Sequence, residues 1–254
     1  MSIEIIVLLV VYFSAWYAVA TYIKNTGIID IGWGMGFFVL ALYQQISQQN
    51  TVGWIFVIMV GFWGLRLAYH IGKRNLGHPE DFRYQNFRNE WGKSFFIRAY
   101  FQLYLFQGLL MAIVSLPYLE AIKEDQVYIP WLFGLGVAVF LIGYAFEVIG
   151  DAQLKAHISD PTKKGTLIQT GLWKYTRHPN YFGDAMLWWG IFLVSVAVGA
   201  PWWTVVGPLL MTYLLRFLSG VPMMEKRMEK YAGFEQYKQS TSIFIPLPKK
   251  GKQT

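Results

Sequence analysis

The sequence lacks cysteine and is poor in histidine and in charged residues. Because none of the 254 residues is cysteine, disulfides, thiolate zinc sites and cysteine nucleophiles are excluded. The four histidines, at positions 70, 78, 157 and 178, include no pair with the i, i+4 spacing of metal ligands on a helix, so we expect no metal site. Charged residues make up only 15% of the chain, whereas soluble domains average about 25%.

Hydrophobic residues, by contrast, make up 55% of the chain, and the mean hydropathy is +0.34. Side chains that face lipid must be apolar, as must those in the protein interior, so a bilayer explains both departures. Seven apolar segments are long enough, or nearly so, to cross a hydrocarbon core of about 30 Å. They are residues 3–23, 28–46, 52–71, 98–118, 130–150, 184–199 and 202–220. We therefore expect an all-α polytopic membrane bundle of about seven transmembrane helices, with residues 1–254 forming a single membrane domain.

The positive charges predict the orientation of this bundle. Lys and Arg gather in the 72–98 loop, in the 151–183 loop and after residue 220, whereas Lys123 lies in a loop on the other side. Because basic loops stay in the cytoplasm, we expect an outside N-terminus and a cytoplasmic C-terminus. Topology and anionic inner-leaflet lipid thus explain the net charge of +7, and we expect no nucleic-acid partner.

Several ionisable side chains lie inside the predicted spans or close to their ends. Charges are costly there, which makes each of them a candidate for function. Buried ion pairs, such as Asp30 with Arg66, can instead simply hold a bundle together, so both interpretations stay open. As a group near one face they favour a polar site: Asp30, Arg66, Glu147, Asp151, Asp184 and Arg216.

Glu147 and Asp151 are four residues apart and share a helical stripe with Tyr144 at the end of the fifth predicted span. Two carboxylates on one stripe repel each other unless a cation or a hydroxyl-rich ligand lies between them. A ribose or an amide, together with Arg177 or Arg216, would meet that need. A solvated helix end is the alternative interpretation.

The stretch from Gly171 to Asp184, GLWKYTRHPNYFGD, is the most informative part of the sequence. Its polar side chains come just before an apolar helix, and Pro179 keeps the preceding residue extended. Donors are thereby presented at a helix N-terminus, where backbone N–H groups and the helix dipole favour a phosphate or another anion. Asp184 is the exception there, as an N-terminal cap or as an acceptor for a ligand amide or hydroxyl.

Combined motifs resemble the steroid 5-alpha-reductase-like family, and its bacterial branch most of all. They are FEVIGDAQ from Phe146, GLW from Gly171 and RHPNYFGD from Arg177, and the later SGVP from Ser219 and the residues from Tyr237 to Pro246 also fit. The resemblance covers about residues 130–248, which would form the cofactor-binding half. Residues 1–118 match only in their helix pattern and would line the substrate cavity.

This resemblance implies an NADPH-dependent reduction of a carbon–carbon double bond conjugated to a ketone, in a lipophilic, steroid-like substrate. It also implies a place in a bacterial inner membrane. In animal members of the family an acid and a tyrosine in the N-terminal half hold the substrate carbonyl; here Asp30 is the nearest acid in the second span and Tyr69 the nearest tyrosine in the third. Family positions that bind NADPH correspond to Glu147, Asp151, Asn180, Asp184 and Arg216, with Arg177, His178 and Tyr237 as helpers.

The reaction itself explains these residue types. A hydride delivered to the β-carbon pushes negative charge onto the carbonyl oxygen, and a hydrogen-bond donor aimed at that oxygen lowers the barrier by about 3–4 kcal/mol. We expect Tyr69 to donate, with Asp30 orienting it or, when protonated, donating directly. An apolar substrate would enter sideways from the membrane lipids.

Two other functions stay open. The pattern Arg-His-Pro-x-Tyr also occurs in isoprenylcysteine and phospholipid methyltransferases, which use S-adenosylmethionine. Their usual pattern continues with a paired Glu-Glu further along, where this chain has Glu225-Lys226. A non-enzymatic lipid-binding or scaffold protein that kept the fold and lost the chemistry is the second alternative.

Overall fold

The computed structural model describes residues 2–123 and 128–249, and most of them are helical. Within these ranges the only β-type pairing is an isolated parallel bridge between Thr176 and Ser242. The prediction of an all-α fold is therefore confirmed. The chain divides into two compact units, the first made of residues 1–127 and 198–206 and the second of residues 128–197 and 207–254.

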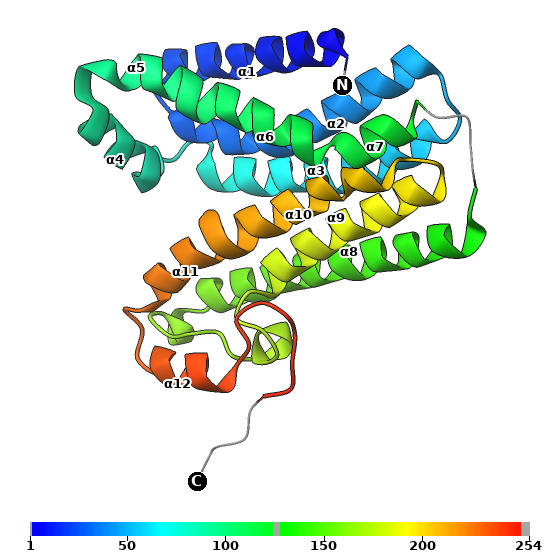
Figure 1. Cartoon of the computed structure of the whole chain (residues 1–254). Helices are drawn as coiled ribbons and strands as arrows, with labels where there is room; N and C mark the ends of the chain where they lie inside the picture. Colours follow the sequence, from blue (N-terminus) through cyan, green and yellow to red (C-terminus); the bar gives the residue numbers. More distant parts are fainter. Residues whose placement is uncertain (1, 124–127, 250–254) are drawn as a thin grey trace. The chain divides into compact units, whose positions relative to one another are not determined.

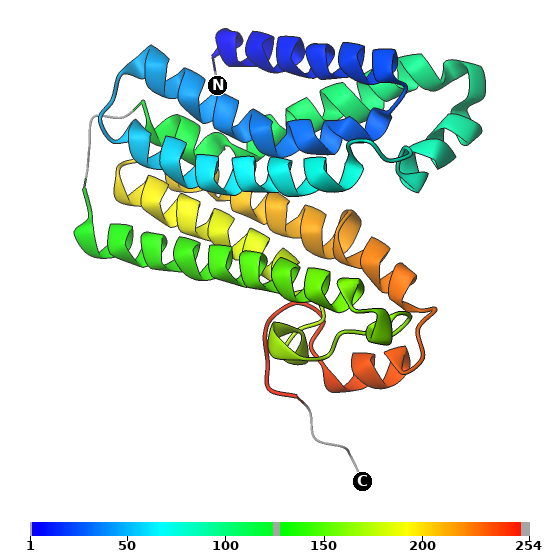
Figure 2. The same cartoon turned by 180° about the vertical axis from the view of Figure 1, so that it is seen from behind.

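Unit 1 is built around two long helices, α2 and α3, which run side by side in opposite directions (Figures 1 and 2). They approach closely because glycines face each other, and a Cβ on Gly34 would lie 2.6 Å from the carbonyl oxygen of Gly64. The helices of this unit are α1 (Ile3–Ile23), η1 (Thr26–Ile28), α2 (Ile29–Gln48), α3 (Gly53–Asn75), α4 (Phe82–Trp91), η2 (Gly92–Ser94), α5 (Phe95–Arg98), the π-helix η3 (Ala99–Leu105), α6 (Phe106–Val114), α7 (Leu116–Ala121) and η6 (Trp202–Val205).

The fourth predicted span, 98–118, is longer and less regular than predicted. An almost unbroken helical run extends from Phe82 to Val114 and includes the π-helical turns of η3. It begins at α4, whose sequence FRYQNFRNEW is too polar to be recognised by hydropathy. The side chain of Asp81 caps α4 by accepting a hydrogen bond from the backbone N–H of Arg83 at 3.0 Å. Part of the predicted 72–98 loop is therefore helical.

Unit 2 is organised by the antiparallel pair α8 and α9, which lie against each other along most of their length (Figure 2). Glycines recur every seventh residue on the contact faces, and a Cβ on Gly143 would lie 2.5 Å from the backbone nitrogen of Leu187. Only glycine permits this approach of two helix backbones. The helices of this unit are α8 (Pro130–Ser159), η4 (Pro161–Lys163), η5 (Gly171–Lys174), α9 (Pro179–Ala197), α10 (Val206–Tyr213), the π-helix η7 (Leu214–Leu218), α11 (Val221–Met228) and α12 (Phe234–Ser240).

Two helix boundaries in unit 2 differ from the prediction. α8 continues nine residues past the predicted end at 150, to Ser159, and α9 begins at Pro179, five residues before 184. The added helical residues are polar, so a hydropathy pattern does not reveal them, although the helical hydrogen bonds continue. Asp151 and Asp184 therefore lie inside helices and not at their ends.

Six helical stretches in the described residues are long and apolar enough to cross a membrane. They correspond to six of the seven predicted spans; α9, with its Asn180 and Asp184, is helical but is not among them. Large apolar side chains such as Ile6, Val10 and Val11 lie exposed along α1. Exposed apolar faces of this extent require a lipid environment. The chain is thus a multi-pass integral membrane protein, and its orientation stays a prediction.

Candidate functional site

Two consecutive side chains of unit 2 converge on the carboxylate of Glu225 in α11. Arg177 donates from Nε to Oε1 at 3.0 Å and from Nη2 to Oε2 at 2.7 Å, so the pair is bidentate. Nε2 of His178 lies 2.8 Å from the same Oε1. Arg177 is only 5% exposed and His178 only 1%. Because a buried guanidinium requires a counter-charge and hydrogen bonds, these residues form one charged cluster in the interior of unit 2.

The same arginine also holds the segment that follows α12. Nη1 of Arg177 donates to the carbonyl of Thr241 at 2.7 Å, and its backbone N–H donates to the carbonyl of Ser242 at 2.8 Å. The neighbouring hydroxyl of Thr176 donates to the carbonyl of Phe244 at 2.8 Å. All three guanidinium nitrogens of Arg177 are therefore engaged within the protein, which gives this side chain a structural role.

Tyr237 connects three parts of unit 2. Its hydroxyl donates to the carbonyl of Trp173 at 2.6 Å, and the indole N–H of Trp173 donates to the carbonyl of Gly150 in α8 at 3.1 Å. Gln153, one turn further along α8, accepts a hydrogen bond from the backbone N–H of Leu172 at 2.9 Å. Burial raises the pKa of Tyr237 above its ordinary value, so the hydroxyl stays protonated and can donate. α12, η5 and α8 are thus joined through buried hydrogen bonds.

The protonation state of His178 follows from its surroundings. Burial lowers the pKa of His178 below its ordinary value; the carboxylate of Glu225 acts against this, while the positive charges of Arg177 and Arg216 add to it. The neutral imidazole then carries its proton on Nε2, because a carboxylate already paired with a guanidinium can only accept. His178 therefore donates to Glu225 as a neutral group.

The acidic stripe of α8 faces the first turns of α9. The amide nitrogen of Asn180 donates to Oδ1 of Asp151 at 3.0 Å, and Glu147, one turn away, is only 3% exposed. Gly183 lets the two backbones touch here, since a Cβ on it would overlap the backbone nitrogen of Glu147. Oδ1 of Asn180 is buried and accepts no hydrogen bond from any residue that the structure describes. Asp184 lies one turn further along α9.

Arg216 lies in the π-helical segment η7, and such segments occur often at functional sites. Its guanidinium carbon is 4.7 Å from the centre of the Phe217 ring. Among the residues described, it has no carboxylate partner. Its positive charge contributes to lowering the pKa of His178, which places it in the same part of unit 2. Arg216 is therefore a cation available to an anionic ligand.

Unit 1 holds a separate, half-buried cluster around Asp30. The hydroxyl of Tyr84 donates to Oδ1 of Asp30 at 2.7 Å, and Nη2 of Arg83 donates to Oδ2 at 2.7 Å. Tyr84 is only 4% exposed, whereas Tyr69 on α3 is 69% exposed. The structure thus pairs Asp30 with Tyr84 in place of Tyr69, because α4 folds back onto the start of α2.

The predicted site residues consequently fall into three groups. Arg177, His178 and Tyr237 belong to a buried structural network. The remaining predicted cofactor residues lie on α8, on the start of α9 and on η7 of the same unit: Glu147, Asp151, Asn180, Asp184 and Arg216. Asp30 and Tyr69 belong to unit 1 and are not partners of each other.

Sequence reasoning missed two residues that organise these groups. In the sequence, Glu225 stands out only as an incomplete acidic pair, although the amphipathic stretch after Pro222 indicates a helix with one buried face. Tyr84 was hidden in an expected loop, where the capping residue Asp81 just before it was the available signal.

Apolar helices in both units and a polar cluster in unit 2 define the class of this protein, a polytopic membrane protein with buried ionisable groups. The chain belongs to the family described as "Protein of unknown function (DUF1295)", which it matches over residues 16–241. It is also similar to "Uncharacterized protein C594.04c" of Schizosaccharomyces pombe, with 22% identity over 265 residues, 91% of this chain and 75% of that protein. No solved structure matches the chain.

Proposed function

We propose that this protein is a membrane-embedded, NADPH-dependent reductase of a carbon–carbon double bond conjugated to a ketone in a lipophilic, steroid-like substrate. The DUF1295 family is associated with steroid 5-alpha-reductase-like proteins, in agreement with the motifs of residues 146–184. The observation that carries the proposal is the composition of the polar groups in unit 2. Among the described residues, Arg216 has no carboxylate partner and Oδ1 of Asn180 accepts no hydrogen bond. The first group suits a phosphate of a dinucleotide, and the second suits its amide.

The residues of unit 2 fit such a cofactor by their chemistry. Arg216 would pair with a phosphate, since a guanidinium matches phosphate oxygens through parallel hydrogen bonds. Oδ1 of Asn180 would accept from an amide N–H, which relieves the cost of an unsatisfied buried acceptor of about 1–3 kcal/mol. Glu147 and Asp151 on α8 supply carboxylates for ribose hydroxyls, and the Arg177 network fixes the loop that leads into α9 and Asn180.

NADPH, when bound, would supply the hydride for the β-carbon, and a proton from water at the α-carbon would complete the reduction. The protein must stabilise the negative charge that the substrate oxygen carries in between. Tyr84 is the donor that the geometry of unit 1 favours, because its hydroxyl is buried and hydrogen-bonded to Asp30. With substrate bound, the Tyr84 hydroxyl would donate its hydrogen bond to the substrate carbonyl in place of Asp30. Asp30, held by Arg83, would orient the phenol before the substrate binds and accept its hydrogen bond again after product release.

Cofactor binding tests the proposal directly. Purified protein in a mild detergent should unfold at a higher temperature with NADPH than with NADH or S-adenosylmethionine, because a ligand that binds only the folded state raises stability. Arg216→Gln should weaken the NADPH effect about tenfold or more in apparent affinity. Lys226→Gln, which removes an exposed charge from α11, is the matched control and should bind as the unmodified protein does.

Turnover tests the residues of unit 1. With an enone lipid as substrate and NADPH oxidation as the readout, Tyr84→Phe should lower kcat about 100-fold, since one donor to a developing oxyanion is worth about 3–4 kcal/mol at most. NADPH affinity should stay unchanged in this variant. Tyr69→Phe removes the hydroxyl of the exposed tyrosine and separates the two candidates. Equal activity of Tyr84→Phe and the unmodified protein would remove Tyr84 from the mechanism.

The alternative function, a methyltransferase that uses S-adenosylmethionine, predicts the opposite binding pattern. Stabilisation by S-adenosylmethionine without any effect of NADPH would refute the reductase proposal and favour the methyltransferase.

A further inference from the structure

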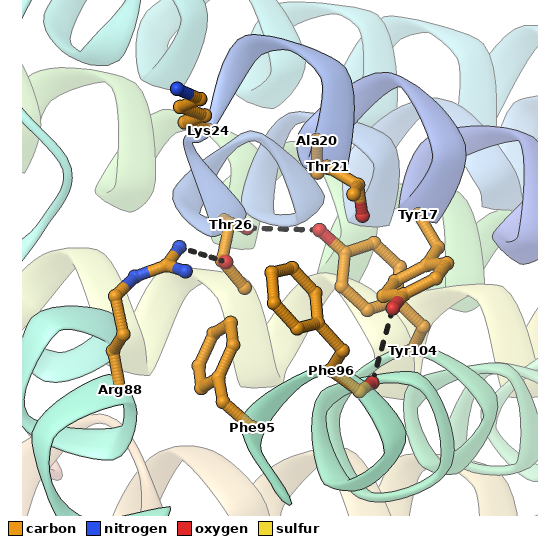
Figure 3. A pocket seen from close by; sticks show the side chains of 9 residues that line it. All are labelled: Tyr17, Ala20, Thr21, Lys24, Thr26, Arg88, Phe95, Phe96 and Tyr104. Carbon is orange, nitrogen blue, oxygen red and sulfur yellow. Dashed lines mark hydrogen bonds between the residues drawn. The ribbon is translucent and has the colours of Figure 1, made fainter. Parts of the chain in front are cut away.

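Unit 1 contains a cavity of about 350 Å³ beside the end of α1 (Figure 3). Its walls come from α1, η1, α4, α5 and η3, so the site described in unit 2 supplies none of them. The volume falls in the range of small-molecule sites, which is about 300–1,000 Å³. The residues that matter for its chemistry are Tyr17, Lys24, Thr26, Arg88, Phe96 and Tyr104.

Two cations, Lys24 and Arg88, line the cavity, and the charge of Arg88 is balanced by Glu80. In the part of the chain that the structure describes, no acidic side chain lines it. Arg88 binds Glu80 through Nε and Nη2, at 3.2 and 3.0 Å, and reaches the hydroxyl of Thr26 at 3.5 Å (Figure 3). Its Nη1 group makes no hydrogen bond to any described residue, and Lys24 has no partner among them either. Two groups of donors therefore remain for an anion.

The backbone of Lys24 has a conformation that residues with a Cβ rarely adopt. It follows the last residue of α1 in the left-handed conformation, with φ 55° and ψ 36°. Glycine is the usual residue there, because it alone has no Cβ penalty. A lysine at this point thus keeps a cation beside the cavity at a conformational cost.

The depth of Lys24 in the membrane follows from the length of α1. At about 1.5 Å per residue, its 21 residues span about 32 Å, close to the hydrocarbon thickness of about 30 Å. If α1 crosses the bilayer, we expect Lys24, the next residue, at the level of the lipid headgroups. Tyr17 and Thr21 lie one turn apart on α1 and line the cavity together with Lys24, which follows the end of the helix. The cavity is thus polar at headgroup level and apolar toward the bilayer core.

We propose that this cavity binds one anionic phospholipid, with its phosphate held by Lys24 and Nη1 of Arg88 and the beginning of an acyl chain against Tyr17 and Phe96. The predicted orientation places Lys24 on the basic, cytoplasmic side, where anionic lipids gather and each cation near the surface favours them. The inference does not depend on the reductase proposal.

Thermal unfolding of the purified full chain in a neutral detergent tests it. Phosphatidylglycerol should raise Tm more than phosphatidylcholine at the same concentration. Lys24→Gly should lower the apparent affinity for phosphatidylglycerol about fivefold. Without lipid, this variant should be at least as stable as the unmodified protein, because glycine adopts φ 55° without penalty. If Lys24 had only a structural role, Lys24→Gly would lower the stability without lipid and leave the affinity for phosphatidylglycerol unchanged.

Two matched variants control the result. Gln49→Gly makes the same backbone change at the end of α2, where φ is 51°, and should raise stability without altering the lipid response. Lys73→Gln removes an exposed charge from α3 and should also leave the lipid response unchanged. An unaltered response of Lys24→Gly to phosphatidylglycerol would overturn the proposal. So would equal stabilisation by soluble glycerol 3-phosphate, which would assign the site to a free phosphate compound.

Discussion

Replacing Glu225 with glutamine keeps the shape of the side chain and removes its charge. The guanidinium of Arg177, whose side chain is 6% exposed, then loses its counter-charge, and one of its donors faces the new amide group. Removing one partner of a buried ion pair costs about 3–5 kcal/mol. Because the Glu225 side chain is 16% exposed, we expect the lower end, about 3 kcal/mol. For a chain of this size that corresponds to a decrease in Tm of roughly 6–12 °C.

The assay is thermal unfolding of purified protein in a mild detergent, followed by tryptophan fluorescence. Glu229→Gln, an exposed change one turn later, is the control and should stay within about 0.5 kcal/mol of the unmodified protein. The double variant with Arg177→Gln should lose less than the sum of the two single changes, since both remove the same interaction. A Glu225→Gln protein as stable as the control, or strictly additive losses, would refute the role assigned to this cluster.

Three further outcomes follow from unit 2. Gly183→Ala should cost about 1–3 kcal/mol, because its Cβ would overlap the backbone nitrogen of Glu147; Gly134→Ala, where a Cβ meets nothing within 4 Å, should not lower Tm. Stability should fall as the pH drops below about 6.5, because the histidine then binds a proton in the unfolded chain, whereas the pKa of buried His178 is lowered in the folded protein. His178→Gln should remove this contribution of about one proton and flatten the curve of Tm against pH between pH 7.5 and 5.5. An unchanged curve would contradict this. Tyr237→Phe loses a 2.6 Å hydrogen bond to a backbone carbonyl and should cost about 1 kcal/mol in the same assay, whereas no loss would show that the bond is not needed.

The spans were predictable because long apolar runs are a local property of the sequence. α1 has the same bounds as its predicted segment, and α3 begins one residue from the predicted start. Hydropathy fails where a helix leaves the apolar region, as in the polar last turns of α8 and in all of α4. Helical hydrogen bonding continues in these segments, but they lack the apolar face by which a helix is recognised in a sequence.

The candidate site was predictable in its residue types and not in its partners. The motif around Arg177 identified the loop, but its acceptor Glu225 is 48 residues away, and only the path of the chain brings the two together. Asp30 was recognised as a costly charge in a span, while its partner Tyr84 was hidden in a segment expected to be a loop. Periodicity describes one helix at a time, so contacts between distant segments stay outside its reach.

The contact between Arg177 and the carbonyl of Thr241 has a consequence for biosynthesis. The two residues are 64 positions apart, so at about 5–20 residues per second Arg177 is incorporated about 3–13 s before Thr241, its acceptor. Until Thr241 is made, a cation destined for a dry interior lacks that acceptor and must stay hydrated. Nascent chains halted before residue 241 should therefore expose this loop to proteases, and release of the final segment should close it.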